Sequence, residues 1–183
     1  MRCGVEVAPV RAEPDDGAEQ VTQALRGELL ETGERVGDWV RVTTAYGYPG
    51  WLREEHLCGD DPVSLARTFL GCPYEWGGLT AAGLDCSGLV HLAYRLTGKL
   101  VPRDSWQQEQ SGAPVTPGSE EVGDLVTYGG ERADHVAFWI GDGRILHATA
   151  RDGLGVVEEP EPGELRARRR HIVRLAANNP TSA

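Results

Sequence analysis

The sequence has no long hydrophobic run, and none of its windows approaches the roughly 18 to 20 consecutive apolar residues that a membrane-spanning helix requires. We therefore expect no membrane partner. Cysteine is scarce too: there are four, Cys3, Cys58, Cys72 and Cys86, without a CxxC pair. This small number excludes the dense framework of a disulfide-stabilised domain, and free thiols in a reducing compartment are the expectation.

Positive charge is also in short supply, with 18 Lys and Arg against 28 Asp and Glu and a formal net charge of −10. A surface of this sign repels polyanions, so nucleic acid is not an expected partner. The one basic cluster, residues 166–170, follows an acidic stretch at residues 158–164, which predicts local charge pairing. The first residues lack the apolar run of about 7 to 15 residues of a secretory signal, which predicts a cytoplasmic location.

A length of 183 residues suits one ordinary domain and one small module. From Val5 to Leu57 the chain alternates short apolar runs with turn residues, a pattern typical of a small all-β barrel. The pattern changes at GDDP, residues 59–62, where an Asp and a Pro favour the start of a helix. We therefore predict a first domain at residues 1–59 and a second at residues 60–183.

The second domain is predicted to be α+β, with helices first and an antiparallel sheet after them. One helix starts at Pro62 and stops at Gly71, and another has Asp85 as its N-cap and Gly98 as its C-cap. Strands are predicted at residues 124–128, 135–140, 144–149 and 171–175. The last six residues, NNPTSA, are expected to fray.

Cys86 falls in the first turn of the predicted helix that Asp85 caps. The positive end of the helix dipole and the unpaired backbone N–H groups there predict a pKa below the free thiol value of about 8.5. The backbone N–H of Cys86 would also face the oxyanion of an attacked carbonyl. The competing interpretation is a buried structural cysteine, because apolar residues flank this position.

A thiol nucleophile needs a base, and the base needs an orienting partner. His135 opens one predicted strand and His147 lies on the next, so a tight turn between them brings the two side chains side by side. His135 would accept the thiol proton, and His147 would hold the other ring nitrogen of His135. A zinc site made of Cys86, His135 and His147 is the rival hypothesis, although closely spaced ligand pairs are missing.

Six segments follow one another in an order that a known family shares: PYEWGG (73–78), LDCSGLV (84–90), LVPRDSWQQ (100–108), GDLVTY (123–128), DHVAFWIGDG (134–143) and ILHAT (145–149). Over about residues 62–176 they resemble the NlpC-type cysteine peptidases, papain-like enzymes that cut the peptides of bacterial peptidoglycan. The resemblance implies Cys86 as nucleophile, His135 as base and His147 as orienting residue. It also implies Tyr74 beside the oxyanion site, and neither a metal nor another cofactor.

Residues 5–57 resemble the bacterial SH3-like domain that accompanies some of these peptidases, on runs such as GDWVRV and GYPGWLREEHL. In that branch the small domain helps to wall the active site. The resemblance implies that Tyr48 and Asp85 bind the free amino group of an N-terminal L-alanine. An acidic residue of the small domain would join them, and Glu28 is the candidate.

The same resemblance implies that Ser87, Arg103 and Ser105 meet the rest of an L-Ala-D-Glu dipeptide. Physical chemistry agrees with part of this, because a buried ammonium needs a carboxylate and an α-carboxylate needs a cation, which Asp85 and Arg103 would supply. Without the resemblance, a simple helix cap is the favoured interpretation of Asp85 and a surface charge is the favoured interpretation of Arg103.

The implied activity is hydrolysis of the bond between γ-D-glutamate and a diamino acid in murein tripeptides or tetrapeptides with free N-terminal L-alanine, in the recycling of murein peptides. An exported hydrolase of intact wall is the alternative within this class. A non-catalytic wall-peptide-binding module is the alternative of another class. A lipid acyltransferase of the related permuted fold is disfavoured, because there the histidine precedes the cysteine.

Overall fold

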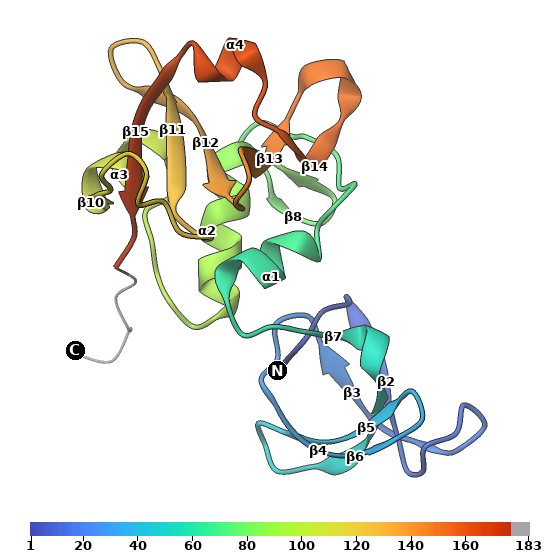
Figure 1. The fold of residues 1–183 in the computed structure, drawn as a ribbon. Helices are drawn as coiled ribbons and strands as arrows, with labels where there is room; N and C mark the ends of the chain where they lie inside the picture. The colour runs from blue at the N-terminus through green and yellow to red at the C-terminus, as the bar shows by residue number, and fades with distance from the viewer. Residues whose placement is uncertain (177–183) are drawn as a thin grey trace. The chain divides into compact units, whose positions relative to one another are not determined.

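The computed structural model describes residues 1–176, and two compact units divide the chain between Thr68 and Phe69 (Figure 1). The sequence places the boundary nearer the N-terminus, at residues 59 and 60. The difference is the helix α1 (Pro62–Arg67), which falls in the N-terminal unit. There the guanidinium of Arg26 donates to the carbonyl oxygen of Thr68 at 2.6 Å. The predicted frayed end, residues 178–183, lies outside the described residues.

The N-terminal unit is built on a five-stranded antiparallel sheet in the order β3-β2-β6-β5-β4. Its elements are β1 (Arg2–Cys3), β2 (Val7–Arg11), β3 (Gln20–Leu25), β4 (Leu30–Val36), β5 (Trp39–Thr44), β6 (Pro49–Arg53), the 3₁₀ turn η1 (Glu54–His56), β7 (Leu57–Cys58) and α1. One core of apolar side chains, with Val10, Val40 and Leu52 fully buried, holds the strands together. The predicted all-β module is therefore confirmed.

The C-terminal unit carries a six-stranded antiparallel sheet in the order β10-β15-β11-β12-β13-β14. Its elements are β8 (Leu79–Thr80), β9 (Gly83–Leu84), α2 (Cys86–Leu96), α3 (Ser105–Ser111), β10 (Ala113–Pro114), β11 (Leu125–Gly129), β12 (Ala133–Trp139), β13 (Arg144–Thr149), η2 (Arg151–Gly153), β14 (Gly155–Pro160), α4 (Gly163–Arg166) and β15 (Arg169–Arg174). Helices come first and the antiparallel sheet follows, as the sequence predicts. No helix of the described residues is long and apolar enough to span a membrane.

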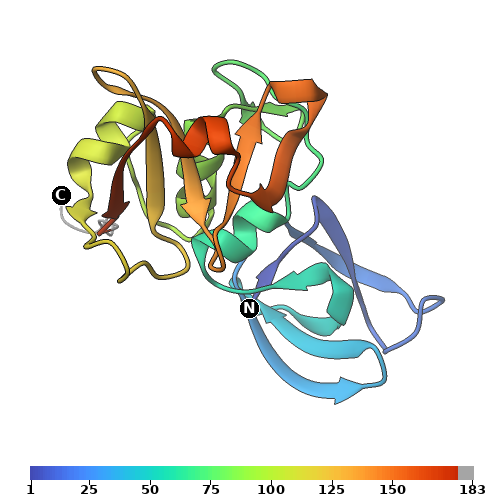
Figure 2. The ribbon, with the colours of Figure 1, turned by 45° about the horizontal axis from the view of Figure 1, so that its top comes forward.

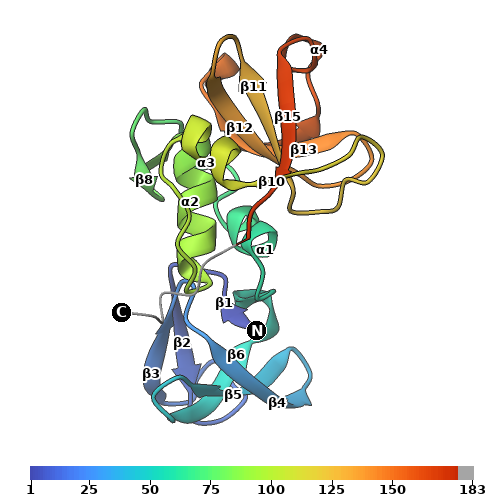
Figure 3. The same ribbon diagram turned by 90° about the vertical axis from the view of Figure 1, so that its left-hand side faces the viewer.

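The helix α2 begins where the sequence places it. The side chain of Asp85, the N-cap, accepts a hydrogen bond from the backbone N–H of Gly88 at 2.6 Å, which satisfies one of the free amides of the first turn. The helix ends at Leu96, and Gly98 follows with a positive φ of 78°, a conformation that favours glycine. Its apolar face, which includes Leu89 and Val90, packs against β12 and β13 (Figure 3).

Among the differences from the predicted elements, one concerns the end of α1 and another concerns β14. The helix α1 ends at Arg67 and not near Gly71, because the amide of Thr68 bonds to the carbonyl of Leu65 in a tighter turn that closes the helix. The strand β14 is missing from the prediction. It forms a hairpin with β13, drawn in orange in Figure 2, and places Glu159 opposite Ile145.

Candidate active site

Cys86 is the first residue of α2, and only 6% of its surface is exposed. The backbone N–H of Val136 hydrogen-bonds to its sulfur. Because Val136 directly follows His135 on β12, the thiol lies beside the strand that carries the predicted base. The structure thus brings the two predicted catalytic elements, the start of α2 and β12, together.

The expected low pKa of Cys86 is wrong for the free protein. Burial raises the pKa of the thiol to about 11, although the backbone amides of Val136, Ser87 and Cys86 itself act in the opposite direction. Desolvation disfavours the charged form, and at this buried position it outweighs the first turn of the helix. The nucleophile is therefore a neutral thiol at rest.

The two histidines form the predicted pair. His135 Nε2 on β12 lies 2.8 Å from His147 Nδ1 on β13, with ring planes at 83° and centroids 5.0 Å apart. Burial, followed by the neighbouring His147, lowers the pKa of His135 to about 3. Burial likewise lowers the pKa of His147, against the opposing effect of a carboxylate beside it. Both rings are neutral at physiological pH, and a neutral imidazole is the form that accepts a proton.

That carboxylate belongs to Glu159 on β14, which sequence reasoning missed. Its Oε1 lies 2.9 Å from His147 Nε2, and both of its oxygens accept hydrogen bonds from Nη2 of Arg151, at 2.6 and 2.5 Å. The only signal in the sequence is the acidic run around residue 159, which predicts charge pairing with the basic cluster at residues 166–170. Within that acidic stretch the predicted local charge pairing is confirmed, because Glu161 pairs with both Arg166 and Arg169.

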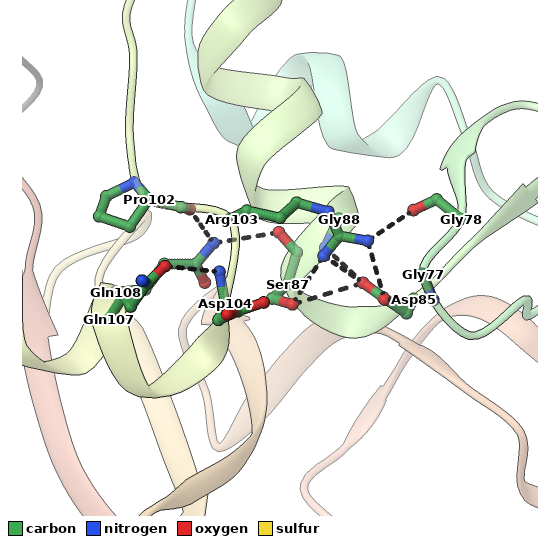
Figure 4. A network of polar contacts seen from close by, with 10 residues as sticks. All are labelled: Gly77, Gly78, Asp85, Ser87, Gly88, Pro102, Arg103, Asp104, Gln107 and Gln108. Atoms are coloured by element: carbon green, nitrogen blue, oxygen red, sulfur yellow. Dashed lines mark hydrogen bonds and ion pairs between the residues drawn. The ribbon is translucent and has the colours of Figure 1, made fainter.

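Asp85 and Arg103 form a bidentate ion pair with both N···O distances at 2.9 Å (Figure 4). The hydroxyl of Ser87 lies 3.4 Å from Asp85 and accepts a bond from Arg103 at 3.0 Å. Gln108 of α3 donates to the backbone carbonyls of Ser87 and Pro102, which ties the segment before α3 to the start of α2. The interpretation of Asp85 as only a helix cap and of Arg103 as only a surface charge is therefore incomplete, because the two side chains pair with each other.

The carboxylate of Asp85 is held by hydrogen bonds from Gly77, Gly88 and Arg103 of its own unit. Burial alone would raise the pKa of Asp85, but hydrogen bonds from Arg103 and from the backbone amides of Gly88 and Gly77 outweigh it and hold the pKa below its usual value. The carboxylate is thus ionised and its charge is compensated by Arg103. A ligand ammonium at this position would have to share Asp85 with Arg103 or take its place.

A cleft of about 480 Å³ opens over these groups. Its lining includes Asp85, Cys86, Ser87, Arg103 and Ser105. The hydroxyl of Ser105 donates to the carbonyl of Ala133 at 3.0 Å, so it is held against β12 at the cleft wall. The predicted nucleophile and all four predicted substrate-binding residues of this unit therefore share one cleft.

The phenol of Tyr74 lies close enough to Cys86 for an electrostatic interaction between the hydroxyl and the thiol. Burial is the main cause that raises the pKa of its phenol above the usual value, and electrostatic interaction with Cys86 and Asp85 acts in the same direction. The phenol stays protonated and is a hydrogen-bond donor. Its role at the oxyanion site stays a prediction.

Two predicted site residues belong to the N-terminal unit. Tyr48 lies in the turn between β5 and β6, with 43% of its surface exposed. Glu28 lies before β4; its Oε2 accepts from the backbone N–H of Leu25 at 3.1 Å, and its buried Oε1 has no hydrogen-bond partner. Their part in binding an amino group stays a prediction, as do the roles of the other site residues.

The described residues, 1–176, hold no group of three or more His, Cys, Asp or Glu side chains that could bind a metal ion. The rival zinc site therefore has no support from their geometry. Cys86, His135 and His147 instead fit nucleophile, base and orienting residue, the arrangement of a cysteine hydrolase.

Comparison with known proteins agrees with this geometry. The profile of the NlpC/P60 family matches residues 71–169, and that of the bacterial dipeptidyl-peptidase SH3 domain matches residues 10–57. The first match covers more than half of the chain, so the chain belongs to the NlpC/P60 family, a family of cysteine peptidases. The resemblances predicted for both domains are confirmed.

Individual relatives are more distant. Gamma-D-glutamyl-L-lysine dipeptidyl-peptidase of Bacillus cereus is 31% identical over 140 residues, which make up 74% of this chain and 41% of that protein. Dipeptidyl-peptidase 6 of Lysinibacillus sphaericus is 30% identical over 167 residues, covering 80% of this chain and 59% of that protein. A crystal structure of an NlpC/P60 family protein from Bacillus cereus superimposes with a TM-score of 0.62 and 25% identity, covering 94% of this chain and 62% of that one. The chain spans less than two thirds of the length of each of these relatives.

Proposed function

We propose that this chain hydrolyses the bond between γ-D-glutamate and an L-diamino acid in short murein peptides with free N-terminal L-alanine, in the recycling of cell-wall peptides. The observation that carries the proposal is the cleft in which Cys86 lies beside the bidentate Asp85–Arg103 pair. A nucleophile next to groups of both charges suits a short peptide whose end carries both charges. The printed name of the Bacillus cereus relative, a gamma-D-glutamyl-L-lysine dipeptidyl-peptidase, supports the same reaction.

The proposed chemistry begins with the thiol of Cys86. Its proton moves to His135 while the sulfur attacks the side-chain carbonyl carbon of the glutamyl residue, so an S–H bond breaks and a C–S bond forms. The backbone N–H of Cys86 and the hydroxyl of Tyr74 would meet the oxyanion. His135 then gives the proton to the leaving amine, and water hydrolyses the thioester with His135 again as base.

Recognition of the peptide end would depend on the Asp85–Arg103 pair. The proposed dipeptide carries an ammonium on L-alanine and an α-carboxylate on D-glutamate, and these are complementary to Asp85 and Arg103. Such a zwitterion exchanges one ion pair for two, so no charge is left buried alone. A substrate with an acylated nitrogen offers only the carboxylate and leaves Asp85 short of a partner.

The test uses a synthetic L-Ala-γ-D-Glu-diaminopimelate peptide and its N-acetylated twin, with products identified by mass spectrometry. Wild type should release L-Ala-D-Glu from the free peptide. Leaving a buried charge unpaired costs on the order of 2 to 5 kcal/mol, so acetylation should lower kcat/KM by at least about 30-fold. Asp85→Asn should lose a similar factor on the free peptide and little more on the acetylated one.

Each other outcome favours a named alternative. Equal rates on the two peptides would overturn the recognition of a free amine and favour an exported hydrolase that acts on intact wall. No product from either peptide would favour a non-catalytic wall-peptide-binding module. The cytoplasmic location is part of the proposal, and the four free cysteines fit a reducing compartment; cell fractionation tests it.

A further inference from the structure

A carboxylate continues the hydrogen-bond chain that begins at His135. Nδ1 of His147 lies 2.8 Å from His135 Nε2, and Nε2 of His147 lies 2.9 Å from Glu159 Oε1. The side chain of His147 is fully buried, so water does not replace either partner. Both ring nitrogens of His147 are therefore committed, one to the base and one to the acid.

The ionisation of Glu159 decides which nitrogens carry hydrogen. An ionised carboxylate only accepts, so Nε2 of His147 must donate to it. A neutral imidazole has one N–H, which leaves Nδ1 of His147 as an acceptor, and Nε2 of His135 must donate to that acceptor. Nδ1 of His135 then carries a lone pair, and it is the nitrogen available to the thiol of Cys86.

We propose that Glu159 is a positioning residue of the hydrolase proposed above, which fixes the tautomer of His147 and, through it, presents a basic Nδ1 of His135 to Cys86. The hydrogen bonds of Glu159 go to His147 and Arg151, so it acts on the base through His147.

Arg151 keeps Glu159 in the required form. Burial alone would raise the pKa of Glu159, but the hydrogen bonds from Arg151 and His147 hold it below its usual value. Burial lowers the pKa of His147 despite the adjacent carboxylate. The pair thus consists of an ionised acid and a neutral ring, and Glu159 directs a hydrogen atom without protonating His147.

One hairpin supplies all three groups. His147 lies opposite Val157 and Ile145 lies opposite Glu159 in the β13–β14 ladder, so His147 and Glu159 are diagonal neighbours on one face. Arg151 lies in the turn that joins the two strands. The spacing of acid, ring and guanidinium is therefore set by strand register.

Imidazole ¹⁵N–¹H correlation spectra of the full wild-type chain test the tautomers directly, with His147 assigned from the spectrum of His147→Ala. Both His135 and His147 should carry hydrogen on Nε2 and a bare Nδ1 at neutral pH. Hydrogen on Nδ1 of His147 would overturn the proposal. This measurement needs no substrate, so it separates a failure of this proposal from a failure of the proposed reaction.

Glu159→Gln gives the kinetic test. Arg151 should claim the amide oxygen and leave the NH₂ group facing His147 Nε2, which reverses both tautomers. The corresponding Asp-to-Asn change in the serine protease triad lowers kcat about 10⁴-fold, and here kcat should fall by about 100-fold or more with KM within about threefold. Glu109→Gln is the matched control, because Glu109 is also a partly buried carboxylate held by an arginine, Arg170, and this variant should leave kcat unchanged.

The effect must disappear where His147 is absent. In a His147→Ala background, Glu159→Gln should cost less than about threefold, because residues that act as one unit are not additive. A kcat within about threefold of wild type for Glu159→Gln alone, or an equal loss with and without His147, would overturn the proposal.

Discussion

Cys86 and His135 are both neutral in the free protein, because burial raises the pKa of the thiol to about 11 and lowers that of the imidazole to about 3. No thiolate–imidazolium ion pair is stored at rest. The reactivity of Cys86 must then come from geometry: a base with the right tautomer, donors at the oxyanion, and a carbonyl held in place.

Replacing the nucleophile should abolish hydrolysis and keep the fold. Cys86→Ala and Cys86→Ser should lower kcat by several powers of ten, because no other side chain can form the thioester. Cys3→Ser, Cys58→Ser and Cys72→Ser should retain activity, and circular dichroism should show all five variants folded. Near wild-type turnover of Cys86→Ser on the tripeptide would show that the nucleophile lies elsewhere.

The two histidines should differ in the size of their effects. His135→Ala should be as inactive as Cys86→Ala, because base and nucleophile act as one unit. His147→Ala should keep measurable activity, since His147 orients the base without taking up the thiol proton. Steady-state kinetics with the same peptide measure both, and EDTA should have no effect on wild type. A loss in EDTA that zinc restores would revive the metal hypothesis.

At the scale of elements, prediction from sequence succeeds where the signal is local. The N-cap Asp85 can be predicted because its side chain bonds to a backbone amide only three residues further along the chain. The strand β13 can be predicted at residues 144–149 because its own apolar side chains indicate a buried strand. The strand β14 has only Val156 and Val157 between glycine and acidic residues, so its identity depends on pairing with β13. The role of Glu159 cannot be predicted from the sequence for the same reason, because only the pairing of β14 with β13 brings it to His147.

The helix α2 packs so closely against the preceding glycine-rich loop that no side chain fits at Gly88. A Cβ there would lie 2.4 Å from the carbonyl oxygen of Gly78 and 2.8 Å from Asp85 Oδ1. Gly88→Ala should therefore destabilise the protein by about 1 to 3 kcal/mol despite the better helix propensity of alanine, and lower kcat/KM because the cleft wall shifts.

Gly163→Ala is the matched control for this clash. Gly163 also lies in a helix, α4, and a Cβ there meets nothing within 4 Å. Thermal unfolding should show it unchanged or slightly more stable. Equal stability of the two variants would show that the α2–loop contact is looser than the structure has it.

At the scale of the whole molecule, stability should fall as the pH drops. The pKa values of His135 and His147 are lowered by burial, so the unfolded chain takes up protons near pH 6.5 while the folded chain does not. The contribution of the two histidines to the free energy of unfolding is therefore fully present above about pH 6.5. Below that pH it declines by up to about 1.4 kcal/mol per pH unit for each histidine. Carboxylates with lowered pKa values, such as those of Asp85 and Glu161, add to the decline at still lower pH.

Thermal unfolding of the full chain between pH 7.5 and 4.5 measures this dependence. The melting temperature should fall steadily below pH 6.5, and the slope should be smaller in His135→Gln, which has no proton to take up at that position. A melting temperature that stays constant over this range, or rises toward acid, would contradict the burial of the two neutral rings.

The buried thiol also affects how the molecule meets oxidants. Peroxide reacts with thiolate and not with thiol, and it needs access to the sulfur. Burial raises the pKa of Cys86 and Cys58 to about 11 and raises that of Cys3 as well, and the surface of Cys86 is only 6% exposed. Conversion of Cys86 to sulfenic acid should therefore be slow between turnovers. The same burial that keeps the thiol protonated also protects it from oxidation.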